Sequence, residues 1–153
     1  MKTFLSLLAV IAVGLLIYIR LAPSAVERWH VDPTGPAART GEGRFLVRDG
    51  ADRDSPIVAQ SPQNALKQFS EIALASPRTL LLAGTPETGR MTFISRSKLF
   101  GFPDYTTVQS IIADEGTTKL VVYGRLRFGR RDMGVNRARV QSWLKQLTEP
   151  SRS

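Results

Sequence analysis

The first stretch of the chain is a continuous apolar run. Positions 4–19 read FLSLLAVIAVGLLIYI without one charged residue, and Lys2 and Arg20 stand on either side of it. Extended to Leu21, a helix over this run would be about 27 Å long, at about 1.5 Å per residue, which just crosses the hydrocarbon core of a bilayer. A cleaved signal peptide is the alternative, but Arg20 and the proline that follows Ala22 fit its cleavage region poorly. We therefore expect residues 1–21 to form an uncleaved transmembrane anchor.

The next segment, residues 22–43, shows no regular pattern. It carries three prolines and three glycines, and its apolar residues follow neither the helical nor the strand period. Prolines and glycines at this density are typical of turns and connecting chain. The segment is therefore predicted to be a tether between the anchor and a folded domain.

Regular patterns begin at residue 44. Ser61-Pro62 is typical of a helix start, since serine caps free N–H groups and proline suits the first turn. Apolar residues then recur at spacings of three and four, and a second helix, beginning between Asp132 and Asn136 and running to Thr148, has the same kind of stripe. The two predicted stripes are Ala65, Leu66, Phe69, Ile72 and Ala73, and Val140, Trp143, Leu144 and Leu147. Period-two patterns predict strands over 44–48, 79–83, 90–96, 105–113 and 119–128, and the first helix covers 62–75.

The order of these elements, β-α-β-β-β-β-α, indicates the fold class. Two helices are too few to alternate with the strands, so the strands are expected to pair antiparallel with the helices on one face. We predict a two-layer α+β domain over residues 44–149, with a sheet of about five strands and two helices. Residues 150–153 would be a short tail.

Composition limits the chemistry. The 153 residues include no cysteine and one histidine, which excludes a disulfide scaffold and any cysteine-based zinc or iron–sulfur site. We expect neither a metal nor a cofactor. Basic residues outnumber acidic ones 21 to 13, and residues 90–153 alone hold twelve basic and five acidic residues. An anionic partner is therefore expected, but not nucleic acid, because no nucleic-acid-binding motif accompanies the charge.

Arginines in this basic half form the first candidate binding site. Arg125 and Arg127 fall on one face of a predicted strand, Arg96 belongs to another strand, and Arg130 follows in a loop. The planar guanidinium group is suited to phosphate and carboxylate ligands. Such a face would bind a lipid headgroup, an anionic metabolite or a wall polymer. The alternative is a solvated basic face with local ion pairs.

The second candidate site is the corner before the last helix. Asp132 and Asn136 can satisfy free N–H groups at the helix start, and Arg137 can pair with Asp104 or Asp132 across the corner. The residues would serve either as a rigid structural corner or as part of a ligand site, and the sequence leaves both interpretations open. Asp104 and Asp132 are also the two carboxylates on which an enzyme would depend.

The apolar segment LFGFP at 99–103 also has two interpretations. We expect Phe100 and Phe102 to cover the end of the sheet as core residues, because large aromatic side chains are usually buried. The alternative is a loop that touches lipid.

Three stretches carry a family resemblance: RSKLFGFPDY (96–105), FGRRDMGVNRARVQSWL (128–144) and RLAPSAVERWHVDP (20–33). They resemble the domain of unknown function 1499 family, in particular its alphaproteobacterial members. The resemblance covers essentially the whole chain and implies a membrane-anchored protein of the bacterial envelope or the plastid. It implies no activity.

Together these observations favour an envelope protein with a single inner-membrane anchor and a domain in the periplasm. The leading hypothesis is a non-enzymatic module that binds an anionic ligand, a lipid headgroup or an envelope protein through the arginine-bearing sheet face. An envelope enzyme that uses Asp104 and Asp132 on an anionic lipid or wall component is the alternative, so whether the chain is an enzyme stays open. A structural subunit of an envelope complex, with an apolar patch around Phe100 and Phe102, is the third.

Overall fold

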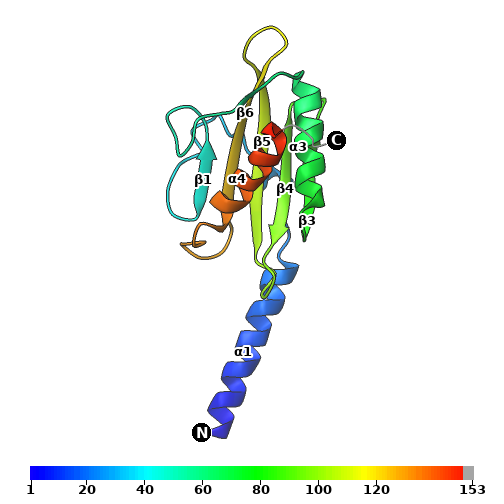
Figure 1. The fold of residues 1–153 in the computed structure, drawn as a ribbon. Coiled ribbons are helices and arrows are strands. Elements are labelled where there is room, and N and C mark those ends of the chain that lie inside the picture. The colour runs from blue at the N-terminus through cyan, green and yellow to red at the C-terminus, as the bar shows by residue number, and fades with distance from the viewer. Residues whose placement is uncertain (150–153) are drawn as a thin grey trace.

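A computed structural model of the chain describes residues 1–149, and the predicted tail of residues 150–153 lies outside the described residues. Helix α1 (Lys2–Leu21) projects from one end of an α+β domain, as Figure 1 shows. By length and composition it is the one helix within residues 1–149 that could cross a membrane, a test that an N-terminal signal sequence also meets. The predicted apolar helix is therefore present.

Antiparallel strands build the sheet of the domain. Their order is β1-β6-β5-β4-β3, and a two-residue strand, β2, pairs with β6 beside β1. The strands are β1 (Arg44–Val47), β2 (Ile57–Val58), β3 (Thr79–Thr85), β4 (Arg90–Arg96), β5 (Pro103–Ile112) and β6 (Thr118–Leu126). The predicted two-layer α+β fold is confirmed. Within residues 1–149, β2 is the one strand that was not predicted, because two residues are too short to show an alternating pattern.

Helices α3 (Pro62–Ala75) and α4 (Val135–Thr148) cover one face of this sheet (Figure 1). The Ser61 side chain accepts a hydrogen bond from the Asn64 N–H, so the predicted cap starts α3 as expected. The aromatic rings of Phe69, Phe93 and Trp143 meet in the core with centroid distances of 5.7 to 6.2 Å. One contiguous apolar core therefore joins both helices to the sheet.

The second face of the sheet is covered by the segment that was expected to be a tether. A short helix, α2 (Val26–Trp29), places the Trp29 ring on the Tyr105 ring with centroids 3.8 Å apart and planes 8° apart. Ala22 and Ala38 are buried as well. Residues 22–43 are thus packed against the domain, because the tryptophan and the small apolar residues cover a sheet face that would otherwise be exposed.

Helix α1 is joined to the domain without a free linker. Ile19, in its last turn, is buried, and the Tyr18 and Phe128 rings form a T-shaped pair with a centroid distance of 6.4 Å. A Cβ added at Gly101, in the β4–β5 loop, would lie 2.9 Å from Nε of Arg20. The end of the helix therefore lies directly against the β4–β5 loop and the end of β6.

Candidate functional site

Two of the predicted ligand-binding arginines hold the chain that covers the second sheet face. Arg125 is buried, and its guanidinium donates to the Trp29 carbonyl, to the Tyr123 carbonyl at 3.1 Å and to Oγ1 of Thr107 at 3.2 Å. Its guanidinium also lies over the Trp29 and Tyr123 rings. Burial lowers the pKa of Arg125 to about 10, so the group is still cationic at neutral pH.

Arg127 makes the same kind of contact nearer to α1. Nη1 donates to the Pro23 carbonyl at 2.9 Å and to the Tyr105 hydroxyl at 3.1 Å, and that hydroxyl lies 2.7 Å from Oγ of Ser24. Arg125 and Arg127 do share one sheet face, as predicted, but that face is covered. Arg125 is buried and Arg127 is half-buried under the segment that covers this face, so the open arginine-bearing face that the binding hypothesis requires is not formed.

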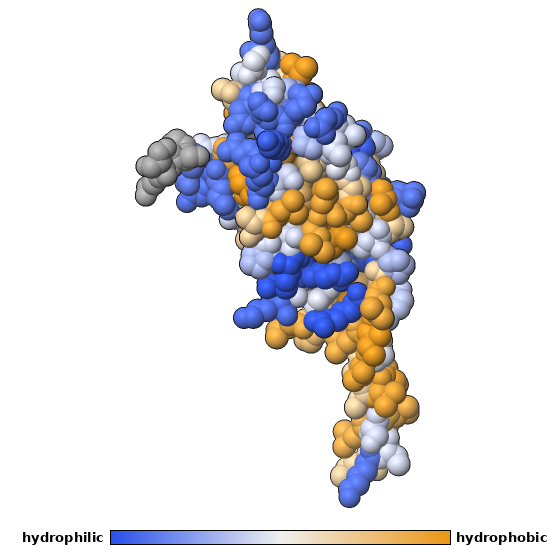
Figure 2. Space-filling view, turned by 90° about the vertical axis from the view of Figure 1, so that its right-hand side faces the viewer, coloured by the Kyte–Doolittle hydropathy of each residue, from blue (hydrophilic) through white to orange (hydrophobic). Residues whose placement is uncertain are grey.

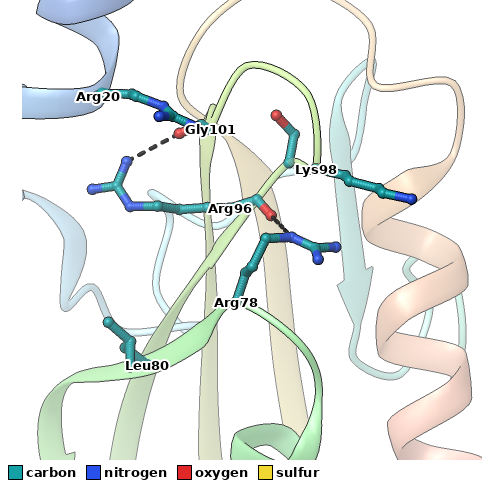
Figure 3. Close-up of a pocket in the computed structure, with 7 residues that line it drawn as sticks. Arg20, Arg78, Leu80, Arg96, Lys98 and Gly101 are labelled. Atoms are coloured by element: carbon teal, nitrogen blue, oxygen red, sulfur yellow. Dashed lines mark hydrogen bonds between the residues drawn. The ribbon is translucent and has the colours of Figure 1, made fainter.

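Arg96, the third of these arginines, lines a cavity of about 400 Å³ at the end of the domain next to α1. We call it the Arg96 cavity, and its lining residues are Arg20, Arg78, Leu80, Arg96, Ser97, Lys98 and Gly101. Nη1 of Arg96 donates to the Gly101 carbonyl at 3.0 Å, and Nε of Arg78 donates to the Arg96 carbonyl at 3.1 Å. In Figure 3 the guanidinium groups of Arg20 and Arg96 lie on one side of the β4–β5 loop, whereas Arg78 and Lys98 extend on the other.

The charge around the Arg96 cavity is not balanced. Within residues 1–149 none of its four basic side chains forms an ion pair with an aspartate or glutamate. Figure 2 shows hydrophilic residues gathered at the end of the domain that adjoins the apolar helix. Four basic residues that line one cavity, with no acidic residue among its lining, attract an anion, and guanidinium groups are well suited to phosphate.

The corner before α4 is a structural cap. The Asp132 carboxylate accepts hydrogen bonds from the Gly134 and Asn136 N–H groups, at 3.1 and 2.8 Å. Asn136 is fully buried, and its Oδ1 accepts from Nη1 of Arg139 at 3.1 Å. Gly134 adopts a φ of 80°, which glycine reaches without strain. These bonds favour the interpretation of the corner as a rigid structural feature.

The expected ion pairs of Arg137 are not the ones that form. Nη2 of Arg137 lies 3.8 Å from Oδ1 of Asp52, and its guanidinium lies over the Phe45 ring. Arg139 forms the ion pair with Asp104 instead, with Nη2 3.3 Å from Oδ2. The helical spacing explains the exchange, because residues 136 and 139 fall on the same face of α4 and this face is turned to the sheet. Arg130 is exposed, and lines a separate cavity of about 350 Å³ with Arg44 and Arg127.

Asp104 is a carboxyl group whose pKa is strongly perturbed by burial. Burial raises its pKa to about 6, against the opposing effect of the Arg139 cation, and the nearby Asp132 charge raises it slightly further. Asp104 faces Arg139, Asp132 is engaged in the cap, and neither lines the Arg96 cavity. The enzyme alternative therefore gains no support from this geometry.

The Arg96 cavity contains three basic residues that the sequence analysis did not select. The sequence pattern marks Arg20 only as the flank of the predicted anchor, and Arg78 and Lys98 lie in loops. Arg20 begins the RLAPSAVERWHVDP stretch and Lys98 lies in the RSKLFGFPDY stretch, so these two residues belong to segments that carry the family resemblance, whereas Arg78 does not. Arg78 and Arg20 line the same cavity as Lys98 only because the start of β3 and the end of α1 lie beside the β4–β5 loop.

The fold and this site define a class: an α+β domain held at the end of an apolar N-terminal helix, with cations at their junction that form no ion pair within residues 1–149. The model of one family, described as "Protein of unknown function (DUF1499)", matches residues 30–147. The chain belongs to this family, as its motifs indicated. No curated protein and no solved structure matches the chain.

Proposed function

We propose that this chain is a single-pass membrane protein whose domain binds the phosphate group of an anionic lipid headgroup, without catalysis, in the Arg96 cavity. The observation that carries the proposal is the unbalanced set of cations, Arg20, Arg78, Arg96 and Lys98, at the end of the apolar helix. Arg20 follows the last uncharged turns of α1, so in a membrane it lies at the level of the headgroups. The cavity would then open at the depth where lipid phosphates are.

The chemistry of the lining supports a lipid over a free anion. Leu80, which is 67% exposed, adds an apolar surface beside the cations. A lipid headgroup presents a phosphate next to an apolar glycerol and acyl region, and this pairs with cations beside an apolar residue. Free phosphate would use only the cations.

The test is a binding titration on the full-length protein in a nonionic detergent, with phosphatidylglycerol as the probe and native mass spectrometry as the readout. We expect Arg20→Gln with Arg96→Gln to weaken binding roughly 30-fold, since each basic residue contributes about 1 kcal/mol to such an anionic contact. The matched control is Arg39→Gln with Arg53→Gln, which removes two exposed arginines away from the cavity. The control should bind as the unmodified chain does.

Three arms keep this test decisive. Phosphatidylcholine, whose headgroup has no net charge, should bind weakly to every variant. Glycerol phosphate, which carries the anion without acyl chains, should compete poorly, and competition as strong as that of the lipid would make the site one for a soluble anion. Equal losses in the cavity variant and the control variant would show general charge attraction and would remove the proposal.

We propose further that the domain faces the periplasm. A short N-terminal anchor ahead of a folded domain is typical of export, and distant basic residues of a long domain have little effect on insertion. A reporter fused to the C-terminus, active only in the periplasm, should be active, and a cytosolic reporter at the same position should be silent. The reverse pattern would place the Arg96 cavity against the cytoplasmic leaflet.

A further inference from the structure

The β4–β5 loop presents apolar side chains beside the membrane helix. Leu99 is 80% exposed and Phe100 is 48% exposed, although both are large and apolar. They line a cavity together with Val13, Leu16 and Ile17 of α1. The expectation that Phe100 is a core residue was therefore wrong, because the loop extends past the end of the sheet and lies against the helix.

The loop is built to hold these side chains in place. The Ser97 N–H donates to the Phe102 carbonyl, the Phe102 N–H donates to Oγ of Ser97, and the Gly101 N–H donates to the Ser97 carbonyl, all at 3.0 to 3.2 Å. Gly101 has a φ of 70°, which closes the turn. A short closed turn loses little further conformational entropy when its tip enters another medium.

Aromatic rings link the loop to the domain and to the helix. The rings of Phe100 and Phe102 lie 5.6 Å apart, those of Phe102 and Phe128 lie 6.3 Å apart, and Phe128 meets Tyr18 of α1. Aromatic side chains are enriched where a membrane protein passes through the bilayer interface, although tyrosine and tryptophan are the types most often found there. Basic residues, Arg96 and Lys98, follow directly on the domain side of the tip.

From this geometry we infer that the β4–β5 loop is a second membrane contact, which inserts Leu99 and Phe100 into the acyl–headgroup boundary beside α1. The inference rests on the proposed membrane anchor. The occupant is the bilayer, because the loop tip lies alongside residues 13–17 of α1, and these must be in the hydrocarbon if the helix spans it. The apolar tip and the cations behind it match the order of acyl chain and headgroup across the interface.

The absence of cysteine from the chain allows a direct test by single-cysteine labelling. Full-length variants Leu99→Cys, Ile112→Cys and Val10→Cys carry an environment-sensitive NBD label and are reconstituted in phosphatidylcholine–phosphatidylglycerol vesicles. Ile112 is the matched control, since it is also apolar and 71% exposed but lies at the far end of β5. Val10, in the middle of α1, reports on the anchor itself.

We expect the label at position 99 to be quenched by lipids with a nitroxide near the headgroup and to be shielded from aqueous iodide at least fivefold better than the label at 112. A label at 99 as accessible as that at 112 overturns the inference. If the label at 10 is still quenched by lipid in that case, the proposed anchor stands, and if it is not, both proposals fail. Shielding at 99 that disappears on dilution of protein in lipid would indicate a second copy on the loop and would also overturn the inference.

Discussion

Replacing Trp29 by alanine should unfold the domain at a temperature lower by more than about 10 °C. The ring is stacked on Tyr105 and is 9% exposed, and truncation of a buried tryptophan costs about 3 to 5 kcal/mol. For a domain of this size, a loss of 1 kcal/mol lowers the melting temperature by about 3 °C or more. The substitution also removes the contact between the Arg125 guanidinium and the Trp29 ring.

The measurement is thermal unfolding of the full chain in detergent, followed by tryptophan fluorescence. The chain has two tryptophans, so in Trp29→Ala the signal comes from Trp143 in the helix-covered core alone. Val26→Ala, in the same helix α2 and 39% exposed, is the matched control and should shift the transition little. If both variants have the same melting temperature as the unmodified chain, residues 22–43 are not packed on the sheet in solution.

Acidification should stabilise the unmodified domain relative to an Asp104→Asn variant. The folded-state pKa of Asp104 is raised from 3.8 to about 6, so between these values the folded state binds more protons than the unfolded one. Stability from this group is therefore fully present below pH 3.8 and is lost as the pH rises through 6. Relative to neutral pH, the gain in the free energy of unfolding is about 1 kcal/mol at pH 5 and approaches about 3 kcal/mol below pH 3.8.

The test compares unfolding free energies of the two proteins at several pH values from 7 to 4. His30 has a pKa lowered chiefly by burial, with Arg90 and Arg125 adding to the effect, and so acts in the opposite direction, but it cancels because both proteins retain it. Asp114→Asn removes an equal charge from the exposed β5–β6 turn and serves as the control. If the difference in unfolding free energy between the unmodified chain and Asp104→Asn does not change with pH, the Arg139 cation offsets the effect of burial on the pKa of Asp104 completely.

The sequence pattern predicted the elements well because each is encoded locally. Each of these signals lies within a single element: the cap at Ser61, the apolar stripe of α4 and the alternation of β4. The helix over 62–75 and the strand over 90–96 have the bounds that were predicted. The helix-covered core follows from the same pattern. The fold class needed no information on long-range contacts.

The role of residues 22–43 could not be predicted, because its contacts depend on residues far along the chain. Trp29 is packed on Tyr105, and the carbonyls of Pro23 and Trp29 accept from Arg127 and Arg125. Irregular chain with prolines satisfies its backbone groups through side chains of the sheet, which leaves no periodic signal. The same bonds explain why the two arginines that suggested a ligand site are covered by this segment, with Arg125 buried and Arg127 half-buried.

The candidate site was predicted only in its chemistry. Guanidinium groups in the basic half pointed to an anion, and Arg96 is the predicted residue that lines the cavity. Its neighbours Arg20 and Arg78 come from the end of α1 and the start of β3. Their convergence is a consequence of how the helix meets the sheet, and no spacing in the sequence encodes it.

The close junction between α1 and the domain has a mechanical consequence. A helix of 20 residues is about 30 Å long, and in a thinner bilayer such a helix tilts to keep its apolar length covered. Ile19 is buried, Tyr18 contacts Phe128, and Arg127 donates to the Pro23 carbonyl. These contacts fix the end of α1 to the domain, so the domain is not expected to keep its orientation when the helix tilts. If α1 spans a membrane, as proposed, the whole domain leans with the helix, and the thickness of the bilayer then sets the angle at which the outer surface of the domain is presented.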